Sequence, residues 1–315
     1  MLGISLSRSR YQRIFEHATH APHWLELKQD EFEASYNKRP FVVEHRLAED
    51  PHFSFESLSR LAKRVPRNKV LFRTGVVPID TDFDLSGQAY RKGLTLDDAL
   101  DRMEENQGYV VINNPEHDAE YRPVIEGILG ELALCTDRIE PYMNWYSTYV
   151  FISAHNSVTP YHMDREMNFL LQVRGTKTVR LWDPNDDVVM TPAQKDELLS
   201  YASEQRPQYH DGLEARAMLF ELRPGLGVHH PFIAPHLVHT GKALSISLAV
   251  TFRTLRSDVW RDAHRMNYTL RNWGRNPRPV GKSYLLDLTK ATAVRTIRAV
   301  RALRKQRPEP VPAHE

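Results

Sequence analysis

An imidazole and a carboxylate stand one residue apart at His162-Met163-Asp164. On a β-strand, side chains two positions apart point to the same face, so this segment offers a nitrogen and an oxygen ligand to one point. Two histidines and one carboxylate with open coordination positions are the ligands of non-haem Fe(II) oxygenases. The chain has 15 histidines and 40 acidic residues, so such a triplet also arises by chance, as an exposed histidine beside a solvated aspartate.

A third ligand would have to come from elsewhere in the chain. The candidates gather in segment 229–239, between two predicted strands, where a late ligand on a β-barrel would lie. Four histidines occupy this segment: His229, His230, His236 and His239. The pattern alone does not choose among them.

The elements that must position these residues are mainly β from residue 142 onward. Short apolar runs separated by turn residues predict a barrel or sandwich, with strands at 149–152, 218–222 and 244–252. Segments 169–173 and 178–182 resemble the arms of a hairpin, with Gly175 in the turn between them. The polar segment 183–217 contains a predicted helix at 192–203.

The N-terminal part has a different character. Residues 1–20 are polar and basic and are expected to form a flexible arm, and residues 21–135 read as an α/β region. Within that region we expect strands at 69–73 and 109–112, a long loop at 75–95 and an apolar-faced helix at about 119–134.

Composition limits the class of protein. Its 315 residues, 41% hydrophobic and 26% charged, are ordinary for one large or two modest globular domains. The net charge of +2 does not predict nucleic-acid binding. Cys135 is the only cysteine, which excludes an intrachain disulfide and a cysteine zinc site and favours a cytoplasmic location. We see neither a secretory signal nor an apolar run of membrane-spanning length.

The segment around the first ligands matches a longer pattern. Residues 159–177 read TPYHMDREMNFLLQVRGTK, which fits T-P-x-H-x-D-x-x-x-N-F-x-x-Q-x-x-G-x-K at every fixed position. This segment resembles the Jumonji-C branch of the cupin 2-oxoglutarate oxygenases, especially the bacterial cupin-like proteins and the asparaginyl hydroxylase that acts on hypoxia-inducible factor. The resemblance covers about residues 145–253 and implies a double-stranded β-helix (jelly-roll, cupin) core at 136–256.

The resemblance also implies roles for individual residues. His162 and Asp164 would bind iron, Lys177 would bind the distal carboxylate of 2-oxoglutarate with help from the Thr159 hydroxyl, and Asn168 would lie close to this co-substrate.

In the family, the distal histidine precedes a polar residue of the closing strand by fifteen positions. His236 and Thr251 have that spacing, so His236 is our first choice for the third ligand and His239 the second. Two departures are Leu226, where many members carry aspartate, and Thr251, where the asparaginyl hydroxylase has asparagine.

The implied activity is an Fe(II)- and 2-oxoglutarate-dependent oxygenase. It would hydroxylate a C–H bond, foremost of a protein or peptide side chain, and release succinate and CO₂. The alternatives are oxidation of a small molecule, demethylation of an N-methyl group, and a non-catalytic metal-binding cupin that acts as a regulatory module. The complete set of ligand residues argues against the last of these.

The C-terminal region, 257–305, is basic and helical, and 306–315 is expected to be disordered. A predicted helix over 284–305 carries an apolar stripe beside an arginine stripe. Its apolar members are Val294, Ile297, Val300 and Leu303. This helix could form a homodimer, as in the asparaginyl hydroxylase, bind nucleic acid or an anionic membrane surface, or pack on its own barrel. We favour the homodimer.

Overall fold

The structure is a computed structural model, and it describes residues 4–5, 7–18, 23–91, 93–201 and 207–305. The chain divides into two compact units. The first consists of residues 1–189 and 207–255, and the second of residues 190–206 and 256–315. The expected N-terminal region and most of the expected barrel therefore belong to one unit.

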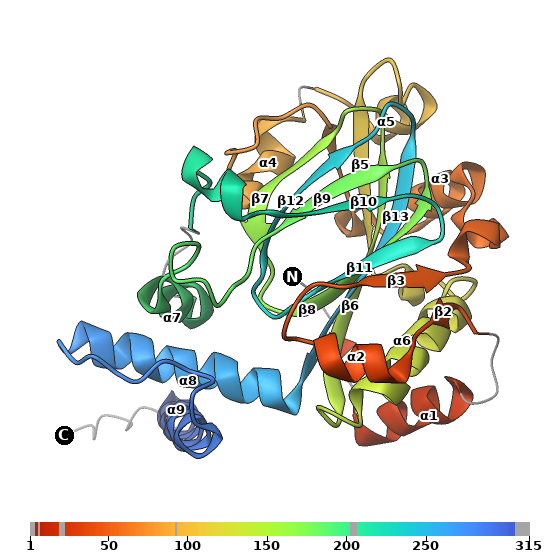
Figure 1. Cartoon of the computed structure of the whole chain (residues 1–315). Helices are drawn as coiled ribbons and strands as arrows, with labels where there is room; N and C mark the ends of the chain where they lie inside the picture. Colours follow the sequence, from red (N-terminus) through yellow and green to blue (C-terminus); the bar gives the residue numbers. More distant parts are fainter. Residues whose placement is uncertain (1–3, 6, 19–22, 92, 202–206, 306–315) are drawn as a thin grey trace, which may run out of the picture. The chain divides into compact units, whose positions relative to one another are not determined.

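Two antiparallel sheets form the core of the first unit (Figure 1). In the described part of the chain, the larger sheet has the order β2-β3-β11-β8-β13-β6-β5-β4, with β1 paired to β6, and the smaller sheet has the order β10-β9-β12-β7. The strands of the larger sheet are β1 (Ile4–Ser5), β2 (Leu25–Glu26), β3 (Val42–His45), β4 (Val70–Thr74), β5 (Gly108–Asn113), β6 (Met143–Ser153), β8 (Met167–Arg174), β11 (Leu226–His230) and β13 (Ser245–Thr254). Those of the smaller sheet are β7 (Val158–Met163), β9 (Lys177–Leu181), β10 (Met218–Leu222) and β12 (Pro235–Thr240).

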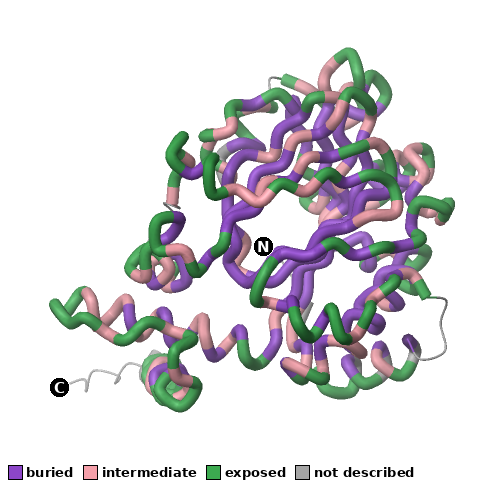
Figure 2. The backbone as a smooth tube through the Cα atoms, viewed as in Figure 1, coloured by how far each residue is buried: buried purple, intermediate pink, exposed green. Residues whose placement is uncertain are grey.

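From β6 to β13 the chain passes repeatedly between the two sheets, as in a jelly roll. The predicted jelly-roll core is therefore confirmed. Figure 2 shows buried residues along the strands of both sheets. Apolar side chains such as Leu170, Val179, Val228 and Ala249 form a common cluster between them, because each strand turns alternate side chains inward.

The hairpin predicted around Gly175 is wrong. β8 pairs with β11 and β13, whereas β9 pairs with β10 and β12, so the two arms lie in different sheets. β8 is buried along almost its whole length, as expected for a central strand that needs a neighbour on each side. Gly175 has φ +69°, and a Cβ there would lie 2.4 Å from the Leu244 carbonyl oxygen, so the turn between the sheets depends on glycine.

Helices surround this core. In the first unit they are α1 (Arg8–Ala18), α2 (Gln29–Ser35), α3 (Phe55–Arg64), α4 (Phe83–Ala89), α5 (Leu96–Asp101) and α6 (Arg122–Thr136). Short 3₁₀ turns occur at Leu47–Glu49, Pro51–Phe53, Arg67–Lys69, Pro115–His117 and Asp211–Arg216.

Two of these helices correct the sequence-based expectations. α1 occupies most of the segment expected to be a flexible arm, and it packs against α6. α4 lies inside the expected loop 75–95. The expected disordered tail, 306–315, lies outside the described residues, as do 1–3, 6 and 19–20 of the arm.

The second unit contains α7 (Pro192–Ser200), α8 (Leu255–Asn272) from Arg256 onward, and α9 (Tyr284–Lys305). The helix predicted at 284–305 is confirmed. Buried aspartates join these helices. Asp196 of α7 accepts hydrogen bonds from the Nδ1 of His264 at 2.6 Å and the Nε of Arg271 at 2.8 Å. Asp262 of α8 accepts one from Arg295 of α9 at 2.8 Å.

None of the described helices combines the length and the apolar content that a bilayer crossing requires.

Candidate metal centre

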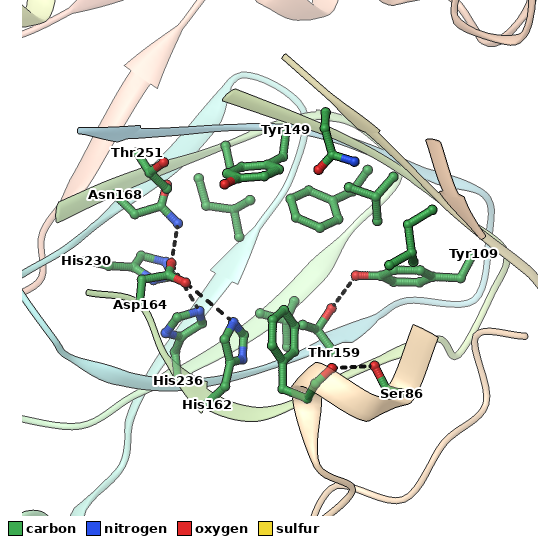
Figure 3. Close-up of a pocket in the computed structure, with 18 of the residues that line it drawn as sticks. Ser86, Tyr109, Tyr149, Thr159, His162, Asp164, Asn168, His230, His236 and Thr251 are labelled. Carbon is green, nitrogen blue, oxygen red and sulfur yellow. Dashed lines mark hydrogen bonds and ion pairs between the residues drawn. The ribbon is translucent and has the colours of Figure 1, made fainter. Parts of the chain in front are cut away.

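A cavity of about 240 Å³ lies within the first unit. Side chains from both sheets and from α4 line it (Figure 3). Its polar or ionisable lining residues are Arg73, Ser86, Tyr109, Asn113, Tyr149, Thr159, His162, Asp164, Asn168, Lys177, His230, His236 and Thr251. All seven residues expected to hold a metal or co-substrate are among them.

Three potential metal ligands converge at one side of this cavity. His162 on β7 and His236 on β12 are directly opposite each other in the sheet, and Asp164 follows β7 immediately. One ligand atom from each of the three lies within 4.8 Å of the others. The Nε2 atoms of His162 and His236 are each 3.9 Å from a different oxygen of Asp164. Figure 3 shows the three side chains turned toward one another.

Backbone carbonyls orient both imidazoles. The Nδ1 of His162 lies 2.7 Å from the Pro160 oxygen, and the Nδ1 of His236 lies 3.1 Å from the Ala234 oxygen. A neutral ring that donates from Nδ1 keeps its lone pair on Nε2, the nitrogen that faces Asp164. Metal-binding histidines are usually held in this way, so the two rings are preorganised as ligands.

Phe83 of α4 also holds His162. The two rings are stacked, with centroids 3.8 Å apart and an interplanar angle of 1°. We did not predict this contact, because residues 75–95 contain glycine, proline and several aspartates and resemble a loop. Nothing in the spacing of Phe83 indicates that it meets a residue on a strand almost eighty positions later.

The other histidines of segment 229–239 have different roles. Both ring nitrogens of His229 are hydrogen-bonded within the protein. Its Nδ1 donates to the Asn168 carbonyl oxygen at 3.1 Å, and its Nε2 accepts a hydrogen bond from the Asn37 backbone N–H at 3.1 Å. His239, our second choice, is half-buried near Arg180 and does not line the cavity. His230 does line it, without joining the set of ligand atoms within 4.8 Å of one another.

Lys177 introduces a positive charge into the cavity wall. Its Nζ donates to the Ser247 hydroxyl at 2.6 Å and lies 5.3 Å from the centroid of the Phe151 ring. Burial lowers the pKa of Lys177 from 10.5 to about 7, and no carboxylate of the described residues offsets this effect. A buried ammonium without an anionic partner is the group that a bound carboxylate would stabilise.

Thr159 has an unforeseen neighbour. Its hydroxyl lies 2.8 Å from the Tyr109 hydroxyl, across the cavity from the histidines (Figure 3). Burial raises the pKa of Tyr109, so its phenol keeps its proton and remains a hydrogen-bond donor. The strand at 109–112 was predicted, but its sequence does not indicate which of its side chains reach a site.

Asn168 and Thr251 lie on the larger sheet, near Asp164. The Asn168 amide nitrogen is 3.5 Å from the Asp164 carboxylate, and the Thr251 hydroxyl donates to the Ser147 carbonyl oxygen at 2.7 Å.

These donors suit both expected groups. Two imidazole nitrogens and one carboxylate on one side match the ligand set of a non-haem Fe(II) centre. The buried Lys177, in a cavity that the Thr159 and Tyr109 hydroxyls also line, suits the carboxylate of a small dicarboxylic acid.

Two antiparallel sheets wound as a jelly roll around a ligand cavity are the architecture of the cupins. Residues 14–257 match the cupin-like domain family. Because the match covers well over half of the chain, this protein belongs to that family.

The similarity to solved structures is distant. The crystal structure of Escherichia coli ribosomal oxygenase YcfD has 15% sequence identity and a TM-score of 0.45, with 92% of this chain and 70% of that chain covered. The structure of YcfD in complex with cobalt and 2-oxoglutarate has the same identity and TM-score, with 93% and 64% covered. None of the curated proteins matches this sequence.

Proposed function

We propose that this protein is an Fe(II)- and 2-oxoglutarate-dependent oxygenase that hydroxylates a C–H bond, foremost of a protein or peptide side chain. One observation carries the proposal. A single cavity has the His162, Asp164 and His236 ligand atoms within 4.8 Å of one another and, in its wall, the buried Lys177 without a carboxylate partner in the described chain. A structural metal site would need the ligands alone and would gain nothing from a desolvated lysine.

The polar residues of the cavity fall into two groups, metal ligands and residues that would bind the co-substrate. His162, Asp164 and His236 would hold Fe(II) on one face and leave positions open for other ligands. Lys177, Thr159 and Tyr109 would bind the distal carboxylate of 2-oxoglutarate. The bound metal would supply the oxidation of a substrate C–H bond by O₂, with 2-oxoglutarate converted to succinate and CO₂. The protein orients the reactants and keeps water out, since Tyr109, His162, Lys177 and His236 are buried, and Thr159 and Asp164 are partly buried.

The proposal of a protein or peptide substrate rests on the resemblance of residues 159–177 to oxygenases with such substrates. Oxidation of a small molecule and removal of an N-methyl group use the same site. Mass spectrometry of candidate substrates distinguishes these reactions, because hydroxylation adds one oxygen and demethylation removes a methyl group. A non-catalytic module would bind the metal without consuming 2-oxoglutarate.

The test is the conversion of 2-oxoglutarate to succinate by purified protein with Fe(II) under air. We expect Fe(II)-dependent succinate formation. Asp164→Ala should abolish this activity, because the variant lacks the carboxylate among the three metal ligands. Asp183→Ala is a matched control, since this carboxylate is exposed and its one hydrogen bond in the described part of the chain comes from the Asn185 backbone N–H of a turn. If Asp164→Ala retains the activity of the wild type, the assignment of the metal ligands is wrong.

We also propose that α9 mediates a homodimer and that the protein is cytoplasmic. Three side chains of the apolar stripe of α9 are exposed, by 46% for Ile297, 43% for Val300 and 65% for Leu303. Its neighbouring arginines, Arg295 and Arg298, pair with Asp262, which leaves them less available to a polyanion. The lone Cys135 fits a reducing compartment.

A further inference from the structure

A row of three polar side chains crosses the larger sheet beside the candidate metal centre. Asn168 on β8 is paired with His230 on β11 and with Thr251 on β13. Directly paired residues point to the same face of a sheet, and all three line the cavity. Their exposed fractions are only 2% for His230, 5% for Asn168 and 4% for Thr251. Figure 3 shows the row next to Asp164.

His230 is the unexplained member of this row. Neither of its ring nitrogens has a hydrogen-bond partner in the part of the chain that the structure describes. A buried polar group without a hydrogen-bond partner destabilises the fold, so a histidine with two such nitrogens is unfavourable unless a ligand satisfies them. The adjacent His229 provides the contrast, because both of its nitrogens are satisfied by the protein.

The other two members of the row each direct a donor at the protein. The Thr251 hydroxyl donates a hydrogen bond to the Ser147 carbonyl oxygen, and the Asn168 amide nitrogen faces the Asp164 carboxylate. A neutral imidazole always carries one N–H. Among the described residues, His230 is therefore the member of the row that keeps both its N–H and its second ring nitrogen for a ligand.

The position of His230 indicates which part of a ligand it would meet. Its ring centroid is 4.5 Å from that of His236, at an interplanar angle of 75°. It thus lies beside the metal ligands, although its nitrogens do not join their set. A keto acid that chelates a metal through its carboxylate and keto oxygens must bring that carboxylate next to the metal ligands.

We infer that His230 is a binding residue for the keto-acid end of the co-substrate, to which its imidazole N–H donates a hydrogen bond. The inference rests on the proposed function, because it requires 2-oxoglutarate in this cavity. It assigns the two ends of the co-substrate to different residues, with Lys177, Thr159 and Tyr109 at the distal carboxylate and His230 of β11 at the keto-acid end.

The test measures binding without turnover. Isothermal titration calorimetry with 2-oxoglutarate would compare wild-type protein, His230→Leu and His230→Gln, all loaded with Mn(II) in the absence of Fe(II). Because a hydrogen bond to a charged group contributes about 1.5–3 kcal/mol, we expect His230→Leu to weaken 2-oxoglutarate binding at least roughly tenfold. The variant should still bind Mn(II), and His230→Gln, which retains an N–H donor, should recover part of the affinity.

The ligand-free melting temperature separates this role from a structural one. Leucine removes two unsatisfied buried nitrogens, so we expect the Tm of metal-loaded, co-substrate-free His230→Leu to equal or exceed that of the wild type. His239→Leu, on β12, the next strand along the chain, and outside the cavity, is the matched control and should leave 2-oxoglutarate binding unchanged.

The outcomes are distinct. If wild-type protein binds Mn(II) but no 2-oxoglutarate, the proposed function fails. If the wild type binds 2-oxoglutarate and His230→Leu binds it equally well, only the role of His230 is overturned. If His230→Leu does not fold, NMR of ¹⁵N-histidine-labelled, Zn(II)-loaded wild type decides. A ring-nitrogen signal of His230 that shifts on addition of 2-oxoglutarate supports the role, and an unmoved signal contradicts it.

Discussion

At the scale of single residues, Lys177 makes the site sensitive to pH. Its pKa is lowered to about 7 in the ligand-free fold by burial, against 10.5 in the unfolded chain. Between these two values the unfolded chain binds more protons than the folded one, so the stability contributed by this group increases with pH. A bound carboxylate instead favours the protonated form of Lys177, because it pairs with the ammonium group.

We therefore predict that the affinity for 2-oxoglutarate falls above about pH 7, where the free Lys177 loses its proton. Binding must then be accompanied by proton uptake, and the Kd should rise by roughly tenfold per pH unit until the pKa of the complex is reached. Calorimetry of the Mn(II)-loaded protein, in buffers with different ionisation enthalpies, measures both effects.

Lys177→Met provides the control for this pH dependence. The variant should bind 2-oxoglutarate weakly at every pH between 6 and about 9, without proton uptake at this position. A wild-type affinity that is constant across this range would contradict the assigned role of Lys177.

The residues of the site differ in how far the sequence reveals them. His162, Asp164, Asn168 and Lys177 fall within one segment of nineteen residues and could be predicted from its pattern. Tyr109 and Phe83 could not, because aromatic residues have many ordinary roles, and His230 was predicted only as one of four candidate metal ligands. Tyr109 and His230 reach the cavity through the pairing of strands distant in sequence, and Phe83 reaches it from α4.

At the scale of elements, the turn between β8 and β9 determines which residues meet. The chain leaves the larger sheet after Arg174 and enters the smaller sheet at Lys177. As a hairpin, the two strands would have lain side by side in one sheet. In the jelly roll, Asn168 and Lys177 instead line the cavity from different sheets. The apolar runs at 169–173 and 178–182 predicted both strands, but they do not specify the partners of these strands.

We predict that Gly175→Ala destabilises the first unit by more than the positive φ alone would cost. The left-handed conformation costs a residue with a Cβ about 1–2 kcal/mol. At Gly175 the added Cβ would also lie 2.4 Å from a backbone oxygen, which has little room to move. Urea unfolding monitored by tryptophan fluorescence measures the loss of free energy.

Gly93→Ala isolates the conformational part of that effect. Gly93 has a similar φ of +75°, but nothing lies within 4 Å of the position of its added Cβ. We expect this variant to lose about 1 kcal/mol, the cost of the backbone alone. Equal losses for the two variants would mean that the turn has room for a side chain.

At the scale of the whole molecule, the division into units could be predicted only in part. The basic, helical character of residues 257–305 is evident from composition. The grouping of α7 with α8 and α9 is not, because it involves Asp196, whose partners His264 and Arg271 follow 68 and 75 positions later. A single aspartate within a polar helix gives no sign of such a buried ion pair.

The exposed stripe of α9 leads to a prediction about assembly. We expect the wild type to be a dimer by light scattering and Ile297→Glu/Val300→Glu to be a monomer, because charges would be buried at the interface. Thr292→Glu, on an exposed position of the same helix outside the stripe, should remain dimeric. A monomeric wild type would exclude this role of α9 and leave the cavity assignment unaffected.

The central claim is that the cavity couples O₂ to the oxidative decarboxylation of 2-oxoglutarate. Its most direct test is the mass of succinate formed by Fe(II)-loaded protein under oxygen-18 gas. We predict that succinate carries one oxygen-18 atom, and that Asp164→Ala forms none of this labelled product. Unlabelled succinate, or 2-oxoglutarate that remains intact in the presence of Fe(II), O₂ and a broad set of candidate substrates, would contradict the claim.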